Sequence, residues 1–144
     1  MAQSWLIVER DENWKVDAAN RFSFFGLPNR YQKFAAEIAK GDLVFCYVSS
    51  GKSAFADIRI VQETGLKRLK VQSYDSAFAF YFSTTSVLVL PRENWVSIRD
   101  IDSELELTRG RKDYRPLFQT SIRKLSEHDA ALLKRKLEDA AKNS

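Results

Sequence analysis

The sequence has few of the residues on which small metal-binding and thiol-based sites depend. Cys46 is the one cysteine and His128 the one histidine among 144 residues. A lone cysteine cannot form an internal disulfide, and one Cys with one His cannot assemble a structural zinc site of the Cys/His type. Because the chain carries no disulfide framework, we expect a reducing compartment and a cytoplasmic protein without a metal or other cofactor.

Nucleophilic catalysis by Cys46 with His128 as its base is also disfavoured. Cys46 lies within the apolar run LVFCYV, and His128 falls in the first turn of an expected helix. A reactive thiol needs an exposed, electropositive setting, so the sequence favours an inert buried thiol. The tripeptide GKS at 51–53 lacks the earlier glycine of a P-loop and fits a hairpin turn better.

Long apolar runs and flexible segments are missing as well. The N-terminal stretch MAQSWLIVERDENW has an apolar run too short for a signal peptide or a membrane span, so we expect no membrane partner. With only five Gly and three Pro, the chain is not of low complexity. A hydrophobic content of 44% supports one core, and we expect a single domain over residues 1–144.

The charge balance is mildly basic, with 23 Lys and Arg against 19 Asp and Glu and a net charge of +4. Such a balance favours a polyanionic partner. Basic residues interleaved with aromatic ones concentrate in TRGRKDYRPLF, namely Arg109, Arg111, Lys112 and Arg115 with Tyr114 and Phe118. Cations neutralise phosphates and aromatic faces stack on bases, so this segment suits single-stranded or locally opened nucleic acid. A solvated loop is the alternative.

Hydrophobic patterning predicts several short strands. The runs SWLIVE, LVFCYV and SVLVLP have strand length and composition, and SVLVLP is expected to be a buried strand closed by Pro91. FADIRIV alternates apolar residues with Asp57 and Arg59 and should form a hairpin with LVFCYV across SSGKSA. LKRLKVQ is a possible polar edge strand, and the state of AFAFYFS is left open.

Two helices are expected near opposite ends of the chain. From Asn29 as N-cap, an apolar stripe of Tyr31, Phe34, Ala35 and Ile38 predicts a helix that stops at Gly41. Near the C-terminus, residues 126–129 have the form of a capping box, and the stripe that follows is Ala130, Leu133, Leu137 and Ala140. Strands flanked by helices indicate an α+β domain, with a small barrel-like mixed sheet capped by helices.

Four segments, WLIVERDENW, FFGLPNRYQKF, KGDLVFCYV and LSEHDAALLKRKL, have an order and spacing that resemble the EVE domain. This is a PUA-like family related to the ASCH domains and to the YTH readers of methylated adenine. The features are an aromatic-Gly-x-Pro turn before a short helix, here residues 25–28, and a Gly-Asp before an apolar strand, here residues 41–43. The resemblance spans nearly the whole chain.

The resemblance implies a pocket between the strands and the first helix, in which a flipped-out or methylated base is held. Carried over to this chain, Phe25 would be an aromatic wall, the backbone of Gly26 and Leu27 would meet the base edge, and Asn13 would supply an amide. Further candidates for aromatic walls are Trp14, Tyr47, Trp95, Tyr114 and Phe118, and the phosphates would meet Arg109, Arg111, Lys112 or Arg115. Phe22 and Phe24 are expected in the core.

These features favour a non-catalytic module that binds RNA or DNA carrying a modified base. Two alternatives stay open. One is an ASCH-like amidohydrolase acting on an N-acylated nucleoside, for which Lys33, Lys52 and Glu37 are available. The other is a protein-interaction module in which the aromatic residues belong only to the core. The sequence leaves the oligomeric state open.

Overall fold

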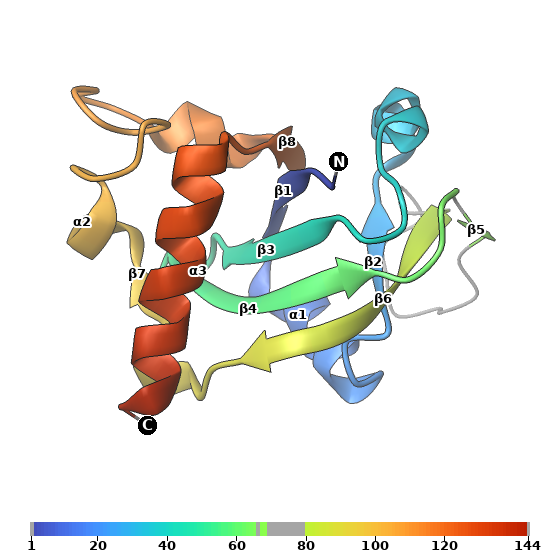
Figure 1. Ribbon diagram of the computed structural model, residues 1–144, viewed down its shortest axis with the longest axis horizontal. Helices are drawn as coiled ribbons and strands as arrows, with labels where there is room; N and C mark the ends of the chain where they lie inside the picture. The colour runs from blue at the N-terminus through green and yellow to red at the C-terminus, as the bar shows by residue number, and fades with distance from the viewer. Residues whose placement is uncertain (1, 66, 69–79, 144) are drawn as a thin grey trace.

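The structure is a computed structural model that describes residues 2–65, 67–68 and 80–143 (Figure 1). It has the expected α+β fold, a curled half-barrel sheet with helices around it. The strands are β1 (Ser4–Glu9), β2 (Phe24–Leu27), β3 (Leu43–Val48), β4 (Ala54–Val61), β5 (Lys67–Arg68), β6 (Phe80–Val89), β7 (Val96–Ser97) and β8 (Ile122–Lys124). The helices are α1 (Asp11–Ala19), α2 (Ile98–Ile101) and α3 (Glu127–Lys142), with the 3-10 helices η1 (Asn29–Ala36), η2 (Arg92–Asn94) and η3 (Arg115–Gln119).

The sheet has the strand order β2-β6-β4-β3-β1-β8, with β5 pairing β6 and β7 pairing β4. β1 runs parallel to β3, and β3 and β4 form the antiparallel hairpin that the sequence predicted. The predicted strand SWLIVE and the apolar strand LVFCYV are confirmed as β1 and β3. Residues 44–48 of β3 are buried without a break, as expected for a strand covered on both faces.

Helix α1 was not predicted from the sequence, which indicated only a strand at SWLIVE and helices after Asn29 and Ser126. Residues 11–19 form an α-helix with Asp11 and Glu12 in the first turn, where negative charge suits the helix dipole. The helix has no continuous apolar stripe, and periodicity therefore gave no signal for it. It packs on the sheet through Trp14, which is half-buried, and through Asp17, which is fully buried.

Because α1 covers that face of β4, the polar residues of its alternating pattern, Asp57 and Arg59, are fully buried. Arg59 Nη1 lies 2.7 Å from Asp17 Oδ2, Nε lies 2.8 Å from Asp57 Oδ1, and Nη2 lies 3.2 Å from Glu9 Oε1. Burial by itself lowers the pKa of the Arg59 guanidinium, but Asp57 and Glu9 outweigh it and raise that pKa well above its usual value. The cation is therefore kept, and its desolvation is offset by its carboxylate partners.

The first predicted helix exists, but as the 3-10 helix η1. The N-cap position falls on Pro28 rather than on Asn29, and the helix ends at Ala36, before Gly41. The stripe is recognisable, because Tyr31 and Phe34 are half-buried and Ile38 is fully buried. Gly41 has φ +95°, a conformation that glycine adopts easily, and it lies in the turn that leads into β3.

The strand expected at SVLVLP is part of β6, but its expected burial is wrong. Val87 is 51% exposed and Val89 40% exposed. β2 pairs with β6 only from Phe80 to Ser83, so the later part of β6 lacks that neighbour. Of the predicted edge strand LKRLKVQ, Lys67–Arg68 form β5, and residue 66 and residues 69–72 lie outside the described residues. The same holds for residues 77–79 of AFAFYFS, the rest of which belongs to β6.

Helix α3 confirms the predicted C-terminal helix. Ser126 Oγ accepts a hydrogen bond from the Asp129 amide at 3.1 Å, as an N-cap does, and Leu133 and Leu137 are fully buried. In Figure 1 the helix crosses the front of the sheet, where it contacts β1, β4, β6 and β7. Among the described residues, no helix has the length and apolar character needed to cross a membrane.

Candidate functional site

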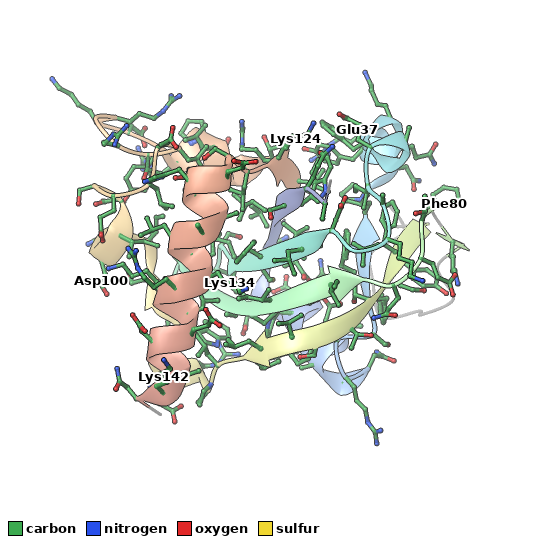
Figure 2. All side chains as sticks on the ribbon, in the orientation of Figure 1. Glu37, Phe80, Asp100, Lys124, Lys134 and Lys142 are labelled. Carbon is green, nitrogen blue, oxygen red and sulfur yellow. The ribbon has the colours of Figure 1, made fainter. Side chains whose placement is uncertain are left out.

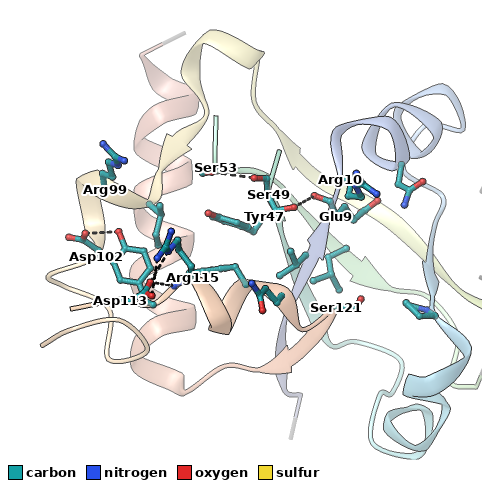
Figure 3. Close-up of a pocket in the computed structure, with 18 of the residues that line it drawn as sticks. Glu9, Arg10, Tyr47, Ser49, Ser53, Arg99, Asp102, Asp113, Arg115 and Ser121 are labelled. Atoms are coloured by element: carbon teal, nitrogen blue, oxygen red, sulfur yellow. Dashed lines mark hydrogen bonds and ion pairs between the residues drawn. The ribbon is translucent and has the colours of Figure 1, made fainter. Parts of the chain in front are cut away.

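A cleft of about 1530 Å³ opens at the edge of the sheet where β1 and β3 end (Figure 3). Because these strands are parallel neighbours, with Glu9 opposite Val48, the residues that follow them lie side by side. The start of α1 and the turn from β2 to η1 line one side of the cleft, and the segment from α2 to η3 lines the other. Tyr47, Ser49 and Ser53 lie between these two sides.

The cleft brings together many of the predicted site residues. Those that line it are Asn13, Gly26, Tyr47, Arg111, Lys112, Tyr114, Arg115 and Phe118. Those that do not line it are Trp14, Phe25, Leu27, Trp95 and Arg109. The amide candidate and the aromatic-basic segment, far apart in sequence, therefore share one cleft.

Phe25 is not an open aromatic wall, and that expectation is wrong. Its side chain is 1% exposed and stacks on Phe82 with ring centroids 5.5 Å apart and planes at 25°. Both faces of β2 are covered, because Phe24 on the other face is 5% exposed and meets Tyr81 edge to face. The expected burial of Phe22 and Phe24 is confirmed at 8% and 5% exposure.

The two tryptophans among the candidates have structural contacts outside the cleft. Trp14 Nε1 donates to Asp57 Oδ2 at 2.8 Å, and its ring meets that of Trp95 at 5.0 Å. Trp95 is 7% exposed and donates from Nε1 to the Leu90 carbonyl at 3.2 Å. Both indoles thus join α1 to the sheet and to the segment after β6.

The aromatic wall of the cleft is formed by Tyr47, Phe118 and Tyr114. Tyr47 and Phe118 stack on each other with centroids 4.2 Å apart, and Tyr114 meets Phe118 edge to face at 6.1 Å. Tyr114 Oη donates to Asp102 Oδ2 at 2.8 Å, and burial together with this carboxylate raises the pKa of Tyr114. Tyr47 and Phe118 are nearly buried while Tyr114 is half-buried, so Tyr114 offers the most ring surface to a ligand.

Asn13 provides a side-chain amide at the same cleft. Its side chain is half-buried at the cleft, and within residues 2–65, 67–68 and 80–143 no hydrogen-bond partner is found for the side-chain amide. Ser49 and Ser53 nearby are engaged, since Ser49 Oγ donates to the Glu9 carbonyl and Ser53 Oγ to the Ser49 carbonyl, each at 3.3 Å. Asn13 is therefore the available amide of the cleft.

The rim of the cleft is rich in cations. Arg10, Arg30, Arg99, Arg111, Lys112 and Arg115 line it, together with the acids Glu9, Glu12, Asp102 and Asp113. Arg115 Nε pairs with Asp113 at 3.0 Å, and Arg10 Nε pairs with Glu12 at 3.4 Å. The sequence analysis missed Arg10, Arg30 and Arg99, because each is a single basic residue in its own segment and only the fold brings them together.

The residues considered for enzymatic chemistry do not meet at this cleft. None of Lys33, Lys52 and Glu37 lines it. Lys52 Nζ donates to the Arg92 carbonyl at 2.6 Å, and Glu37 pairs with Lys124 at 3.2 Å on the outside of the molecule (Figure 2). Cys46 is fully buried, and burial, followed by Glu9 and Asp57, raises its pKa well above 9.0. The thiol is inert by the criterion that the sequence analysis applied.

Away from the cleft, Glu106, His128 and Asp129 place possible metal ligands within 4.8 Å of one another. Asp129 Oδ1 accepts the Glu106 amide at 2.8 Å, and Asp129 Oδ2 accepts the Leu107 amide at 3.0 Å. This cluster lies at the positive N-terminal end of α3, which opposes a bound cation. We assign it the structural role of joining the segment around residue 106 to α3.

Comparisons with solved structures show where this fold occurs. A protein from Pseudomonas putida is 16% identical over 92% of this chain and 98% of that chain, with a TM-score of 0.65. A protein from Leishmania major is 13% identical over 96% of each chain, with a TM-score of 0.67. The Mmi1 YTH domain, solved in complex with RNA, is 12% identical over 98% of this chain and 82% of that chain, with a TM-score of 0.65.

At these identities the structural likeness shows the fold alone. No curated protein matches the sequence significantly. The EVE domain family matches residues 3–135, nearly the whole chain. This match agrees with the half-barrel sheet and the order of its elements, and the chain belongs to the EVE domain family.

Proposed function

We propose that this protein is a non-catalytic nucleic-acid-binding module whose cleft holds one flipped-out, modified base of RNA or DNA. The observation that carries the proposal is the half-buried amide of Asn13, which lies with the aromatic wall in one cleft under a rim of cations. The RNA bound to the Mmi1 YTH domain, a protein of the same fold, supports a nucleic-acid partner.

The parts of the cleft match the physical needs of a base. Stacking on an aromatic side chain contributes about 1–3 kcal/mol per base, and Tyr114 is the ring most open to it. An amide such as that of Asn13 donates and accepts at once, so it can pair with a base edge that offers both. Taking the base out of its strand costs a few kcal/mol, which favours unpaired targets. The cations of the rim meet the phosphates on either side.

The proposal is tested by titrating short single strands of RNA and of DNA, each with and without N6-methyladenine or 5-methylcytosine. We expect salt-sensitive binding with a preference for one methylated base. Asn13→Ala should weaken that complex by about 1–3 kcal/mol, the usual worth of a paired base contact. Asn143→Ala is the matched control, because Asn143 is exposed at the end of α3 and does not line the cleft.

Two results would contradict the proposal. One is the absence of salt-sensitive binding to every strand. The other is equal affinity for methylated and unmethylated strands together with unchanged affinity in Asn13→Ala, which would leave the cleft without a role in base recognition.

A further inference from the structure

Four cations at the rim of the cleft have no carboxylate partner. In the described part of the chain, no ion pair within 4 Å is found for Arg30, Arg99, Arg111 or Lys112, whereas Arg10 and Arg115 are paired. All four side chains are exposed. Because their charge is not cancelled locally, these four are the groups best able to bind an anion.

The four cations lie on the two opposite sides of the cleft. Arg30 belongs to η1, next to the turn that follows β2. Arg99 belongs to α2, and Arg111 and Lys112 lie between α2 and η3. Figure 3 shows Arg99 and Arg115 on one side of Tyr47, with Arg10 and the β2 to η1 turn on the other. Asn13, at the start of α1, lines the same side as Arg30, and Tyr114 lines the side of Arg99, Arg111 and Lys112.

Arg30 is held in place at its side of the cleft. Its guanidinium lies 5.0 Å from the centre of the Tyr31 ring, a cation–π contact. Tyr31 Oη in turn accepts the Ser121 amide at 3.3 Å, which joins η1 to the start of β8. Burial by itself raises the pKa of Tyr31, yet Arg30 and the Ser121 amide outweigh burial and lower it. The positive charge of Arg30 therefore acts at this edge without a carboxylate to cancel it.

From this arrangement we infer that the cleft takes an internal nucleotide of a single strand, with one flanking phosphate against Arg30 and the other against Arg99, Arg111 and Lys112. This inference rests on the proposed function. A free nucleoside has no phosphate, and a terminal nucleotide without a terminal phosphate has one only on its inner side. Of these three ligands, only the internal nucleotide brings an anion to each side of the cleft at once, and so only it uses both sets of cations.

The test compares four probes that carry the same modified base, N6-methyladenine. They are the free nucleoside and three nine-nucleotide RNA strands with the base at the 5′ end, at the 3′ end or in the centre, all without terminal phosphates. We expect the central strand to bind best, each end-placed strand to bind about tenfold more weakly, and the nucleoside to bind most weakly. The negative slope of the logarithm of the binding constant against the logarithm of salt concentration should become shallower by about 0.7 for each phosphate that the protein no longer binds.

Two variants assign the sides. Arg30→Gln should weaken the central strand and only one of the end-placed strands, and Arg99→Gln should weaken the central strand and only the other. Arg135→Gln, which changes an exposed arginine of α3 outside the cleft, is the control and should change nothing. Circular dichroism of each variant confirms that these exposed positions leave the fold intact.

The outcomes separate this inference from the function on which it rests. If the end-placed strands bind as tightly as the central one, or if both variants weaken the same end-placed strand, the inference is wrong while nucleic-acid binding stands. If none of the three strands binds, the inference is wrong, and the proposed function is wrong as well only if the other RNA and DNA strands of its own titration also fail to bind. If the nucleoside binds as tightly as the central strand, the cleft is a nucleoside site and the flanking cations have no phosphate role.

Discussion

Phe25 gives the sharpest test of the structure, because the EVE resemblance placed it at the ligand and the fold places it in the core. Its ring is 1% exposed and stacks on Phe82 at 5.5 Å. Phe25→Ala removes the buried ring and leaves a cavity, which costs about 3–5 kcal/mol. Part of this cost is the aromatic pair itself, worth about 0.5–1.5 kcal/mol beyond its buried area. Since domains are stable by roughly 5–15 kcal/mol, the variant should still fold.

The destabilisation can be measured by urea unfolding followed by tryptophan fluorescence, since the chain has three Trp. At roughly 4 °C per kcal/mol for a domain of this size, the melting temperature should fall by about 12–20 °C. Val87→Ala is the control, because Val87 is 51% exposed and its truncation should cost less than about 0.5 kcal/mol. The reasoning is refuted if Phe25→Ala unfolds like the wild type and yet fails to bind nucleic acid at temperatures where it is folded.

Three further predictions concern ionisable side chains, namely the buried Arg59, the paired Asp11 and the buried Cys46. Arg59→Met should cost about 3–5 kcal/mol in thermal or urea unfolding, because it leaves the carboxylates around Arg59 buried without their cation; a cost below about 1 kcal/mol would contradict this. Asp11→Asn should cost about 0.2–1 kcal/mol at pH 7, since Asp11 pairs with Arg92 at 2.8 Å. The hydrogen bond from Arg92 lowers the pKa of Asp11 below 3.8, so this contribution to stability is present above about pH 4 and is lost as the pH falls through the lowered pKa. Urea unfolding should therefore show a smaller difference in the free energy of unfolding between wild type and Asp11→Asn at pH 2.5 than at pH 7. Cys46 should react with Ellman's reagent only after unfolding, because burial raises the pKa of its thiol and removes it from solvent; rapid labelling of the native protein would show that β3 opens.

Local patterns predicted much of the fold because they record which face of an element is buried. The continuous apolar run of β3 and the capping box and stripe of α3 each needed only neighbouring residues, and both are confirmed. Patterns failed where burial depends on a distant element. The alternation in β4 predicted a strand but not the environment of Arg59, which α1, a helix without an apolar stripe, covers and supplies with Asp17 as a partner.

The candidate site divides in the same way. The basic and aromatic character of residues 109–118 was visible in the sequence, and most of its named residues line the cleft. The resemblance added Asn13, which lines the cleft, and Phe25, which does not. Arg30 and Arg99 gave no signal, because a single exposed arginine looks the same whether or not a cleft lies beside it.

The sequence by itself determined the family, the main strands, the C-terminal helix and the composition of the cleft's most basic segment, since each depends on the order and periodicity of nearby residues. Only the tertiary structure decided that Phe25 is core, that Arg59 is a buried cation, and that Asn13, Tyr114 and cations from separate segments meet at one edge of the sheet. The physical reason is that exposure and charge compensation depend on which distant surfaces pack together, and a local pattern of residues does not contain that information.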